Sequence, residues 1–296
     1  MDPFVEFLDS NRSKKFMTVT PGGNHGDTLI HMGMIKKLRE KNISYSSLNL
    51  EKEYKKNIGL GIKYLINIGL WKIGSSRGFG LLNIPKDTDM IMFEGGGYMN
   101  HIWYGPVLFH QIASRTDLPV VVAPQSYLFK KANLEKIFGV NDNITLFCRE
   151  SYSQKHLKDL SISKNVDIKL SHDTALYLKK KDLEEYFEPI EEDYELISFR
   201  KDRESVVSKE IKKKVINRCE NPLVKDVSTL KKFEDFISLV ENAREVYTDR
   251  LHVAILSKIF SKKCRLYPNR YHKNFGVWEY SLKPHVRYEN LSIREF

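Results

Sequence analysis

The sequence predicts an α/β protein with two domains, each built on a parallel sheet, and a cleft between them. Short apolar runs rich in Val, Ile and Met alternate along the chain with turns and then with helical patterns, which is the βαβ arrangement. The runs are almost continuously apolar, as in strands that are buried on both faces of a parallel sheet. Because ligands of such sheets bind at the carboxyl ends of the strands, we expect the functional residues there.

Five strand-to-turn units follow one another in the N-terminal part of the chain. The predicted strands are 16–20, 90–94, 120–123, 144–148 and 166–170, and the helices after the first two run through 29–40 and 107–114. The stretch 54–77 shows no motif, and we interpret it as a variable loop.

A polar, acidic interval at 179–195 interrupts the alternation, and we interpret it as the segment between the domains. The second part contains predicted strands at 196–199, 244–247 and 262–268, helices from about Ser205 and from Thr229, and a short closing helix at 277–282. We therefore expect an N-terminal domain over residues 1–185 and a C-terminal domain over 186–296 that includes the closing helix.

The composition is typical of a globular protein. The 296-residue chain is 41% hydrophobic and 29% charged, and no apolar run approaches the ~18 residues of a membrane span. The first residues lack the basic-then-apolar order of a signal peptide. Three scattered cysteines (Cys148, Cys219 and Cys264) indicate a reducing compartment and no zinc site. We expect a cytoplasmic protein without a bound metal.

The net charge of +10 at pH 7 comes from lysines and arginines that are spread over many short clusters. A nucleic-acid-binding surface would concentrate them in one stripe with aromatic residues between them. The pattern favours ordinary solvated surfaces, so we expect no nucleic-acid partner. Anionic substrates, or peripheral association with the inner face of an anionic membrane, are compatible with this charge.

Two glycine-rich turns follow predicted strands. They comprise Gly22, Gly23, Asn24 and Asp27 after the first strand, and Gly95, Gly96 and Gly97 after the second. Glycine lets the backbone approach a ligand closely, and the N-terminus of the following helix can hold an anion. Neither turn has the G-x-G-x-x-G or P-loop spacing, so neither a nicotinamide site nor an ATP site is indicated. The geometry of a tight turn, or loop flexibility, is the alternative explanation.

The stretch Asp249-Arg250-Leu251-His252 follows another predicted strand and opens an apolar helix. With Thr248 or Asp249 as the N-cap, Arg250 and His252 fall in the first turn, where backbone N–H groups and the helix dipole favour anions. An arginine and a histidine make this turn electropositive beyond any need of folding. The stretch therefore predicts a bound anion.

Two further arginines, Arg149 and Arg200, also come directly after predicted strands. Arginine at such positions suits bidentate capture of a carboxylate or phosphate. A surface ion pair, of Arg149 with Glu150 and of Arg200 with Asp202, is the alternative for each.

Taken in order, these motifs resemble those of the polysaccharide pyruvyl transferase family. The matching stretches are GGNHGD (22–27), GGG (95–97), APQS (123–126), FCRES (147–151), HD (172–173), SFR (198–200), DRLH (249–252) and YPNRYHKNFG (267–276). The resemblance implies a GT-B-like architecture of two Rossmann-like parallel-sheet domains that face a cleft. It also implies transfer of the enolpyruvyl group of phosphoenolpyruvate onto two hydroxyls of a sugar, which yields a pyruvate ketal and phosphate.

This chemistry suggests roles for the candidate residues. Phosphoenolpyruvate becomes electrophilic at C2 once C3 is protonated, and we assign His252 as the general acid. Arg250 is expected to bind the donor carboxylate or phosphate, with Arg149 or Arg200 as a second clamp. Asp27, expected in the opposite domain, is the candidate for orienting or deprotonating the acceptor hydroxyl. The remaining substrate-binding candidates are Leu251, Lys273, Gly22, Gly23, Asn24 and Gly95 to Gly97.

The expected partners are phosphoenolpyruvate and a sugar acceptor in a glycan or a lipid-linked oligosaccharide, with no further cofactor. Two other classes of function stay open from the sequence. A glycosyltransferase using a nucleotide sugar would have the same fold but would place a carboxylate to clasp the ribose. A non-catalytic glycan- or nucleic-acid-binding protein fits the positive charge, but has little use for His252 beside Arg250.

Overall fold

The computed structural model describes residues 2–73, 75, 78–80, 83–100, 103, 105–129, 137–160, 162, 165–188 and 193–290. The chain divides into two compact units. Unit 1 comprises Met1–Gly23 and Met34–Thr174, and unit 2 comprises Asn24–Gly33 and Ala175–Phe296. Unit 2 therefore begins before residue 186 and also contains a segment from the N-terminal part of the chain.

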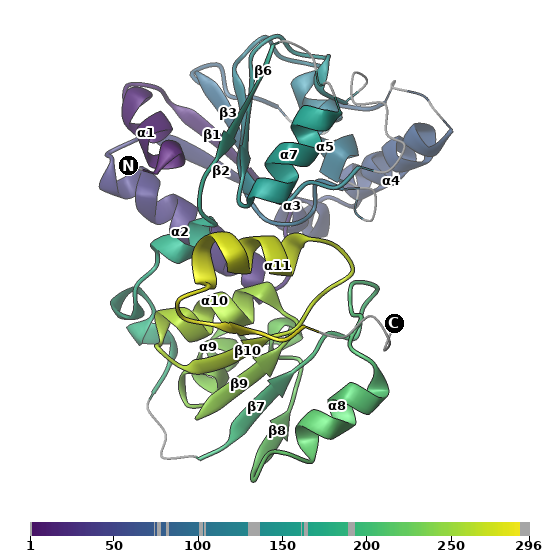
Figure 1. Ribbon diagram of the computed structural model, residues 1–296. Helices are drawn as coiled ribbons and strands as arrows, with labels where there is room; N and C mark the ends of the chain where they lie inside the picture. The colour runs from purple at the N-terminus through teal and green to yellow at the C-terminus, as the bar shows by residue number, and fades with distance from the viewer. Residues whose placement is uncertain are drawn as a thin grey trace. The chain divides into compact units, whose positions relative to one another are not determined.

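Unit 1 is built on a six-stranded parallel sheet in the order β2-β1-β3-β4-β5-β6 (Figure 1). Its strands are β1 (Phe16–Thr20), β2 (Tyr45–Asn49), β3 (Met90–Phe93), β4 (Val120–Gln125), β5 (Ile144–Cys148) and β6 (Val166–Leu170). Its helices are α1 (Pro3–Ser10), α3 (Leu50–Lys56), α4 (Ile58–Lys72), α5 (Gly105–Ala113) and α7 (Ser151–Asp159), with the short turn η1 (Thr174–Tyr177) where the unit ends. Helix α2 (His25–Glu40) begins in unit 2 and ends in unit 1.

Helices cover both faces of the sheet of unit 1, and β5 shows how the sequence achieves this. Leu146 and Cys148 belong to the apolar core that also contains Leu157 of α7. Phe147, between them, packs edge to face against Phe4 of α1 with ring centroids 5.1 Å apart. Since successive side chains of a strand point to opposite faces, a strand covered on both sides is apolar along most of its length.

Unit 2 is built on a five-stranded parallel sheet in the order β11-β10-β9-β7-β8 (Figure 1). Its strands are β7 (Glu195–Ser198), β8 (Pro222–Val224), β9 (Glu245–Thr248), β10 (Lys263–Leu266) and β11 (Arg287–Tyr288). Its helices are α8 (Lys209–Ile216), α9 (Phe233–Glu241), α10 (Leu251–Ile259) and α11 (Lys273–Val277), which continues into the π-helical turn η5 (Trp278–Leu282). Short 3₁₀ turns are η2 (Lys180–Asp182), η3 (Glu184–Tyr186) and η4 (Val227–Thr229).

The first half of α2 is part of the core of unit 2. Leu29 and Ile30 are fully buried in a cluster with Leu196 of β7 and with side chains of α9 and α10. Ile197, the next residue of β7, lies in a second cluster on the other face, with Ile211 of α8. Burial of Leu29 and Ile30 attaches the start of α2 to unit 2 through apolar packing.

The predicted fold class is confirmed, because both units are α/β and both sheets are parallel. The predicted strands 16–20, 144–148 and 166–170 have the observed bounds, whereas β2, β8 and β11 were not predicted. The interpretation of 54–77 as a loop is wrong, since α4 occupies Ile58–Lys72. The acidic interval contains η2 and η3, and its residues 189–192 lie outside the described residues. Within the described part of the chain, no helix is both long and apolar enough to cross a membrane.

Candidate functional site

The turn between β9 and α10 is fixed by side chains that precede Arg250. Thr248 donates its hydroxyl to the Ser198 carbonyl (2.7 Å) and accepts the Arg250 N–H (2.9 Å). Asp249 is fully buried and accepts the Arg200 N–H (2.7 Å), and burial raises the pKa of its carboxyl above the ordinary value. The N-cap residue is Arg250 itself, so the prediction of Thr248 or Asp249 as the N-cap is wrong. The hydrogen bonds of Thr248 and Asp249 hold the turn in place.

Arg250 is buried and bound to carboxylates of its own unit. Its Nε donates to Asp226 Oδ1 (3.0 Å) and its Nη2 to Asp226 Oδ2 (2.5 Å), which is a bidentate pair. Its Nη1 lies 3.4 Å from Asp202 Oδ2. The guanidinium plane is therefore held rigidly at the start of α10.

The other two cations predicted to bind substrate in unit 2 are also paired. Arg200 contacts Asp202 (2.8 Å) and Glu204 (2.9 Å), and Lys273 contacts the same Glu204. Burial alone would raise the pKa of Asp202, but its hydrogen bonds with Arg200 lower the pKa below the ordinary value. The alternative of an Arg200–Asp202 ion pair is thus realised.

The expectation of a strongly electropositive turn is wrong for this structure, because three carboxylates face three cations. An anionic ligand would have to compete with these carboxylates for the guanidinium groups. Sequence reasoning missed Asp226 because it follows β8, a strand that was not predicted. Glu204 lies four residues after Arg200 in a non-helical turn, where that spacing does not predict a contact.

His252 lies against the first turn of α2. A Cβ atom built on Gly26 would lie 2.4 Å from His252 Nδ1 and 2.8 Å from its Cβ, so only glycine permits this approach. The Asn24 side chain accepts the Gly26 N–H (2.8 Å), and the Asp27 carboxylate accepts the Asn24 N–H (2.9 Å), so both side chains cap the start of α2. Asp27, which the sequence order placed in the N-terminal domain, therefore lies in unit 2 near His252.

The first turns of two helices, α2 and α10, consequently meet at His252. The N-terminal N–H groups of a helix and its dipole favour a bound anion. The side chain of Leu251 is buried in the apolar core, so any contact of this residue with a ligand is through its backbone. The arrangement is suited to hold a small anion beside an imidazole that can transfer a proton.

Arg149 is paired with a carboxylate other than the one expected from the sequence. Its guanidinium is buried in unit 1, where Nη1 pairs with Asp173 (2.7 Å) and Nε donates to Ser126 (2.8 Å). Glu150, the predicted surface partner, instead accepts the Ser153 N–H (2.8 Å) at the start of α7. The alternative of a surface pair between Arg149 and Glu150 is wrong, since the partner is Asp173 and the pair is buried.

The glycine turns of unit 1 are largely explained by packing within the chain. Gly22 has φ +90°, and a Cβ on it would lie 2.6 Å from Glu51 Cβ, so glycine is needed at this position. Gly23 N–H donates to Glu51 (3.4 Å). In the second turn, the Ser126 N–H donates to the Gly96 carbonyl (3.0 Å), which joins the turn to the end of β4.

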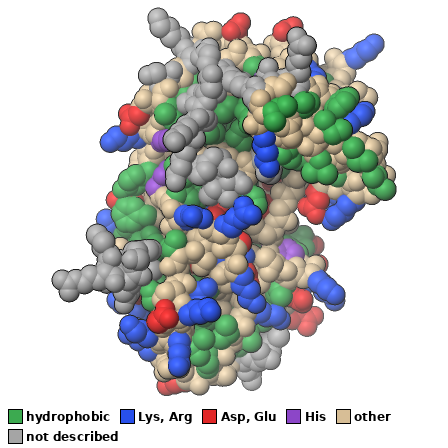
Figure 2. All heavy atoms as spheres, turned by 90° about the vertical axis from the view of Figure 1, so that its right-hand side faces the viewer, with side chains coloured by type: hydrophobic (Ala, Val, Ile, Leu, Met, Phe, Trp, Pro, Cys, Tyr) green, Lys and Arg blue, Asp and Glu red, His purple; other side chains and the backbone are tan. Residues whose placement is uncertain are grey.

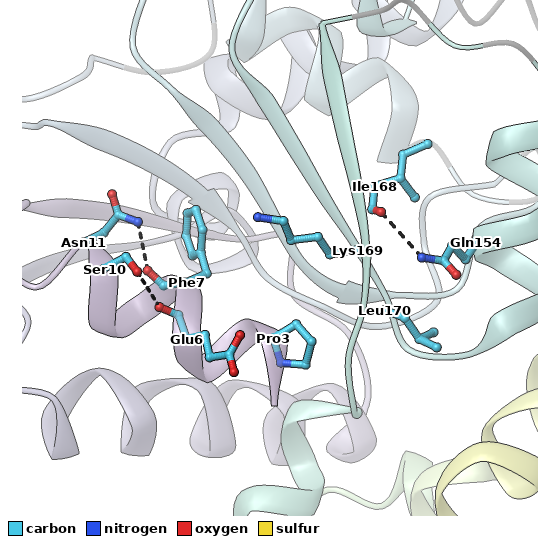
Figure 3. Close-up of a pocket in the computed structure, with 9 residues that line it drawn as sticks. All are labelled: Pro3, Glu6, Phe7, Ser10, Asn11, Gln154, Ile168, Lys169 and Leu170. Carbon is cyan, nitrogen blue, oxygen red and sulfur yellow. Dashed lines mark hydrogen bonds between the residues drawn. The ribbon is translucent and has the colours of Figure 1, made fainter. Parts of the chain in front are cut away.

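A separate pocket of about 680 Å³ in unit 1 contains none of the predicted site residues (Figure 3). It lies between α1, the edge strand β6 and α7, and Figure 3 shows three hydrogen bonds among its side chains and backbone. Its lining residues are Pro3, Glu6, Phe7, Ser10, Asn11, Gln154, Ile168, Lys169 and Leu170. With no candidate residue in its wall, this pocket is not the site that the motifs indicate.

The contact between Gly26 and His252 gives a first prediction. In Gly26→Ala, the new methyl group must displace the whole imidazole, because it would clash with His252 Cβ and not only with the ring tip. We expect turnover to fall by about tenfold or more, since small misplacements of catalytic groups are costly. The free energy of unfolding should change little or fall, because alanine gains about 1 kcal/mol over glycine in a helix whereas overpacking costs about 1–3 kcal/mol.

A matched control is Gly69→Ala in α4, where a Cβ would meet nothing within 4 Å. Turnover and thermal unfolding of both variants would be measured side by side. Wild-type turnover in Gly26→Ala would mean that the position of His252 does not matter.

Comparison with known proteins identifies the class of this α/β protein. The model of the polysaccharide pyruvyl transferase family matches residues 24–271, which is most of the chain. The chain therefore belongs to the polysaccharide pyruvyl transferase family, as its motifs predicted, and is a transferase of that class. A search of curated proteins finds no match.

Solved structures resemble the whole chain at low sequence identity. A functionally uncharacterized protein of Klebsiella pneumoniae subsp. pneumoniae NTUH-K2044 has a TM-score of 0.65 and 22% identity over 97% of each chain. The UDP-GlcNAc 2-epimerase of Methanocaldococcus jannaschii, solved in complex with UDP-GlcNAc and UDP, has a TM-score of 0.51 and 14% identity over 93% of this chain and 89% of its own. These similarities support the GT-B-like fold and carry no statement about activity.

Proposed function

We propose that the chain transfers the enolpyruvyl group of phosphoenolpyruvate onto two hydroxyls of a sugar in a polysaccharide or its precursor. The observation that carries the proposal is His252, which lies beside Arg250 at the point where the first turns of α2 and α10 meet. Such a place suits a small donor with a carboxylate and a phosphate. Membership of the pyruvyl transferase family supports this choice of donor.

In the proposed reaction, His252 gives a proton to C3 of phosphoenolpyruvate, and C2 becomes electrophilic. One sugar hydroxyl attacks C2, phosphate leaves, and the second hydroxyl closes the ring at C2. Of the two hydroxyl protons, one replaces the proton that His252 gave to C3 and the other leaves on the phosphate. The products are a cyclic pyruvate ketal and inorganic phosphate. The proton on C3 explains why an acid is needed, and His is the side chain most often used for this purpose near neutral pH.

Arg250 and Arg200 are proposed to bind the donor anions, with Lys273 beside them. Asp226 holds the guanidinium of Arg250 in one orientation, and Asp202 lies between the two arginines. Arg149 is left out of the donor site, because it belongs to unit 1 and its side chain is only 1% exposed, enclosed with Asp173 and Ser126.

Acceptor binding is assigned to unit 1, at the turns that contain Gly22 and Gly23 and Gly95 to Gly97. Asp27 remains the proposed group for orienting the acceptor hydroxyl, although its carboxylate also caps α2. The acceptor is proposed to be a glycan or a lipid-linked oligosaccharide, and the reaction needs no cofactor. A cytoplasmic location is part of the proposal.

Product formation tests this function directly. The purified chain would be incubated with phosphoenolpyruvate labelled with ¹³C at C2 and a panel of oligosaccharide acceptors. Formation of the ketal would move the label from an alkene to a ketal chemical shift, with one phosphate released per ketal. Phosphate release without a ketal signal would indicate hydrolysis and contradict the proposal.

The rival function is transfer from a nucleotide sugar. The epimerase similar in fold is in complex with UDP-GlcNAc, which is why this donor class is retained as a test. The rival requires a carboxylate that clasps the ribose, and Asp202, Glu204 and Asp226 are instead bound to cations of the same unit. This pairing counts against a ribose clasp, and the choice of phosphoenolpyruvate as donor is supported by membership of the family.

A further inference from the structure

Helix α4 of unit 1 is apolar on two opposite faces. Its inner face contributes Leu60, Tyr64 and Trp71, which pack against the core of unit 1. We use the term outer face for Ile58, Ile62, Leu65, Ile66 and the C-cap residue Ile73. Their exposed fractions are 77%, 53%, 67%, 43% and 79%.

The spacing of these five residues places them in one stripe. They occur at i, i+4, i+7, i+8 and i+15, which falls within an arc of roughly 100° at 3.6 residues per turn. A helix that is apolar all round is normally buried on every side. The inner face of α4 is covered by its own unit, whereas the outer face is exposed over four turns. A stripe of this length indicates an interaction surface.

The charges around the outer face indicate the kind of partner. Lys63 and Lys72 border the stripe on its two sides, both are exposed, and α4 contains no acidic residue. Together α3 and α4 hold five lysines and two glutamates, which gives a net charge of +3. The whole chain carries +10. Apolar side chains flanked by lysines match a lipid surface with anionic headgroups.

Figure 2 agrees with this description. Hydrophobic side chains gather at the upper right of the view, on the side of unit 1 where α4 lies, with lysine or arginine side chains nearby. Helix α4 is 15 residues long, about 22 Å, which is shorter than the ~30 Å hydrocarbon core of a bilayer. With its inner face fixed to the core, it can lie along the membrane surface and cannot span it.

A second copy of the chain is a poorer partner for the same face. In a twofold dimer the same patch meets itself, so the lysines that border the stripe would approach those of the other copy. Like charges at a partly buried contact are unfavourable. We therefore propose that the outer face of α4 docks this protein on the surface of an anionic phospholipid bilayer. This inference does not depend on the proposed reaction.

Vesicle co-sedimentation tests the proposal. The full chain would be mixed with phosphatidylcholine vesicles that contain or lack phosphatidylglycerol. We expect binding to the anionic vesicles, weakened by salt, and a loss of affinity of about tenfold or more in Ile62→Ser/Leu65→Ser, because two side chains no longer enter the lipid. Both residues are more than half exposed, so the fold should be retained.

The matched control is Val224→Ser, which replaces a 57% exposed apolar side chain on the edge strand β8 of unit 2 and should bind vesicles like the wild type. The proposal would be overturned if the wild type did not bind anionic vesicles, or if the double variant bound them as well as the wild type does. A dimer in solution that the double variant abolishes, without vesicle binding, would assign the outer face to a second copy and also overturn it.

Discussion

Replacing His252 by alanine should reduce ketal formation by about 10²–10⁴-fold, the usual contribution of a general acid. His25 at the start of α2 is the neighbouring histidine, and its Nε2 lies 2.7 Å from the Leu230 carbonyl oxygen. Arg250 beside His252 has no transferable proton at neutral pH. The fold should be retained, because the imidazole is only half-buried and lies at a helix end against Gly26. Product formation and thermal unfolding would be measured on the same preparations.

His285→Ala is the control for this prediction, since His285 is exposed in the same unit and far from the motif in the sequence. It should leave ketal formation unchanged. If His252→Ala turned over like the wild type, the proton for C3 would have to come from elsewhere, and the assigned role of His252 would be lost.

Replacing Asp173 by alanine should lower the free energy of unfolding by about 3–5 kcal/mol, because it leaves the charge of Arg149 buried without its partner. The side chains of this pair are 1% and 0% exposed. The double variant Asp173→Ala/Arg149→Met should recover much of the lost free energy of unfolding, since an apolar side chain of similar length tolerates burial. Urea unfolding of the two variants would measure both effects.

The exposed pair of Lys169 and Asp167 in the same unit provides the comparison, with side chains 40% and 56% exposed. Asp167→Ala should cost less than about 1 kcal/mol, as is usual for a surface pair. An Asp173→Ala variant as stable as Asp167→Ala would show that the Arg149 pair does not stabilise the fold and would return Arg149 to the candidates for donor binding.

The strands that could be predicted from the sequence are mostly the buried ones. β1 and β5 are mostly apolar runs, broken only by threonines, inside the sheet of unit 1, while β6, at its edge, alternates apolar and polar residues. The strands that escaped prediction, β2, β8 and β11, all lie at sheet edges, where one side has no neighbouring strand. Edge strands are often short and polar, so they show neither a continuous apolar run nor a regular alternation of apolar and polar residues.

Helix α4 escaped prediction for the opposite reason. A surface helix is recognised by one apolar and one polar face, and α4 has apolar side chains on both. Glycines at 59, 61 and 69 further weaken its helical signal. The feature that makes α4 hard to predict from the sequence, apolar side chains on two faces, is the same feature from which we propose that α4 docks on a membrane surface.

The candidate site shows what local patterns leave out. The strand-end arginines and the DRLH turn were identifiable because each follows a strand, but the carboxylate partners Asp226 and Glu204 come from other loops. The placement of Asp27 near His252 depends on apolar packing between residues far apart in the chain. Only the tertiary structure supplies such contacts.

Isothermal calorimetry with phosphoenolpyruvate tests the central claim, that the start of α10 binds this donor, most directly. The variant needed is Arg250→Gln/Asp226→Asn, because removing Arg250 alone would leave the buried Asp226 unpaired. Arg244→Gln, which removes a 41% exposed arginine of the same unit, is the control.

We predict that the wild type and Arg244→Gln bind phosphoenolpyruvate, that the double variant does not, and that none of the three binds UDP-GlcNAc. Unchanged phosphoenolpyruvate affinity in the double variant, or wild-type binding of UDP-GlcNAc in place of phosphoenolpyruvate, would contradict the claim.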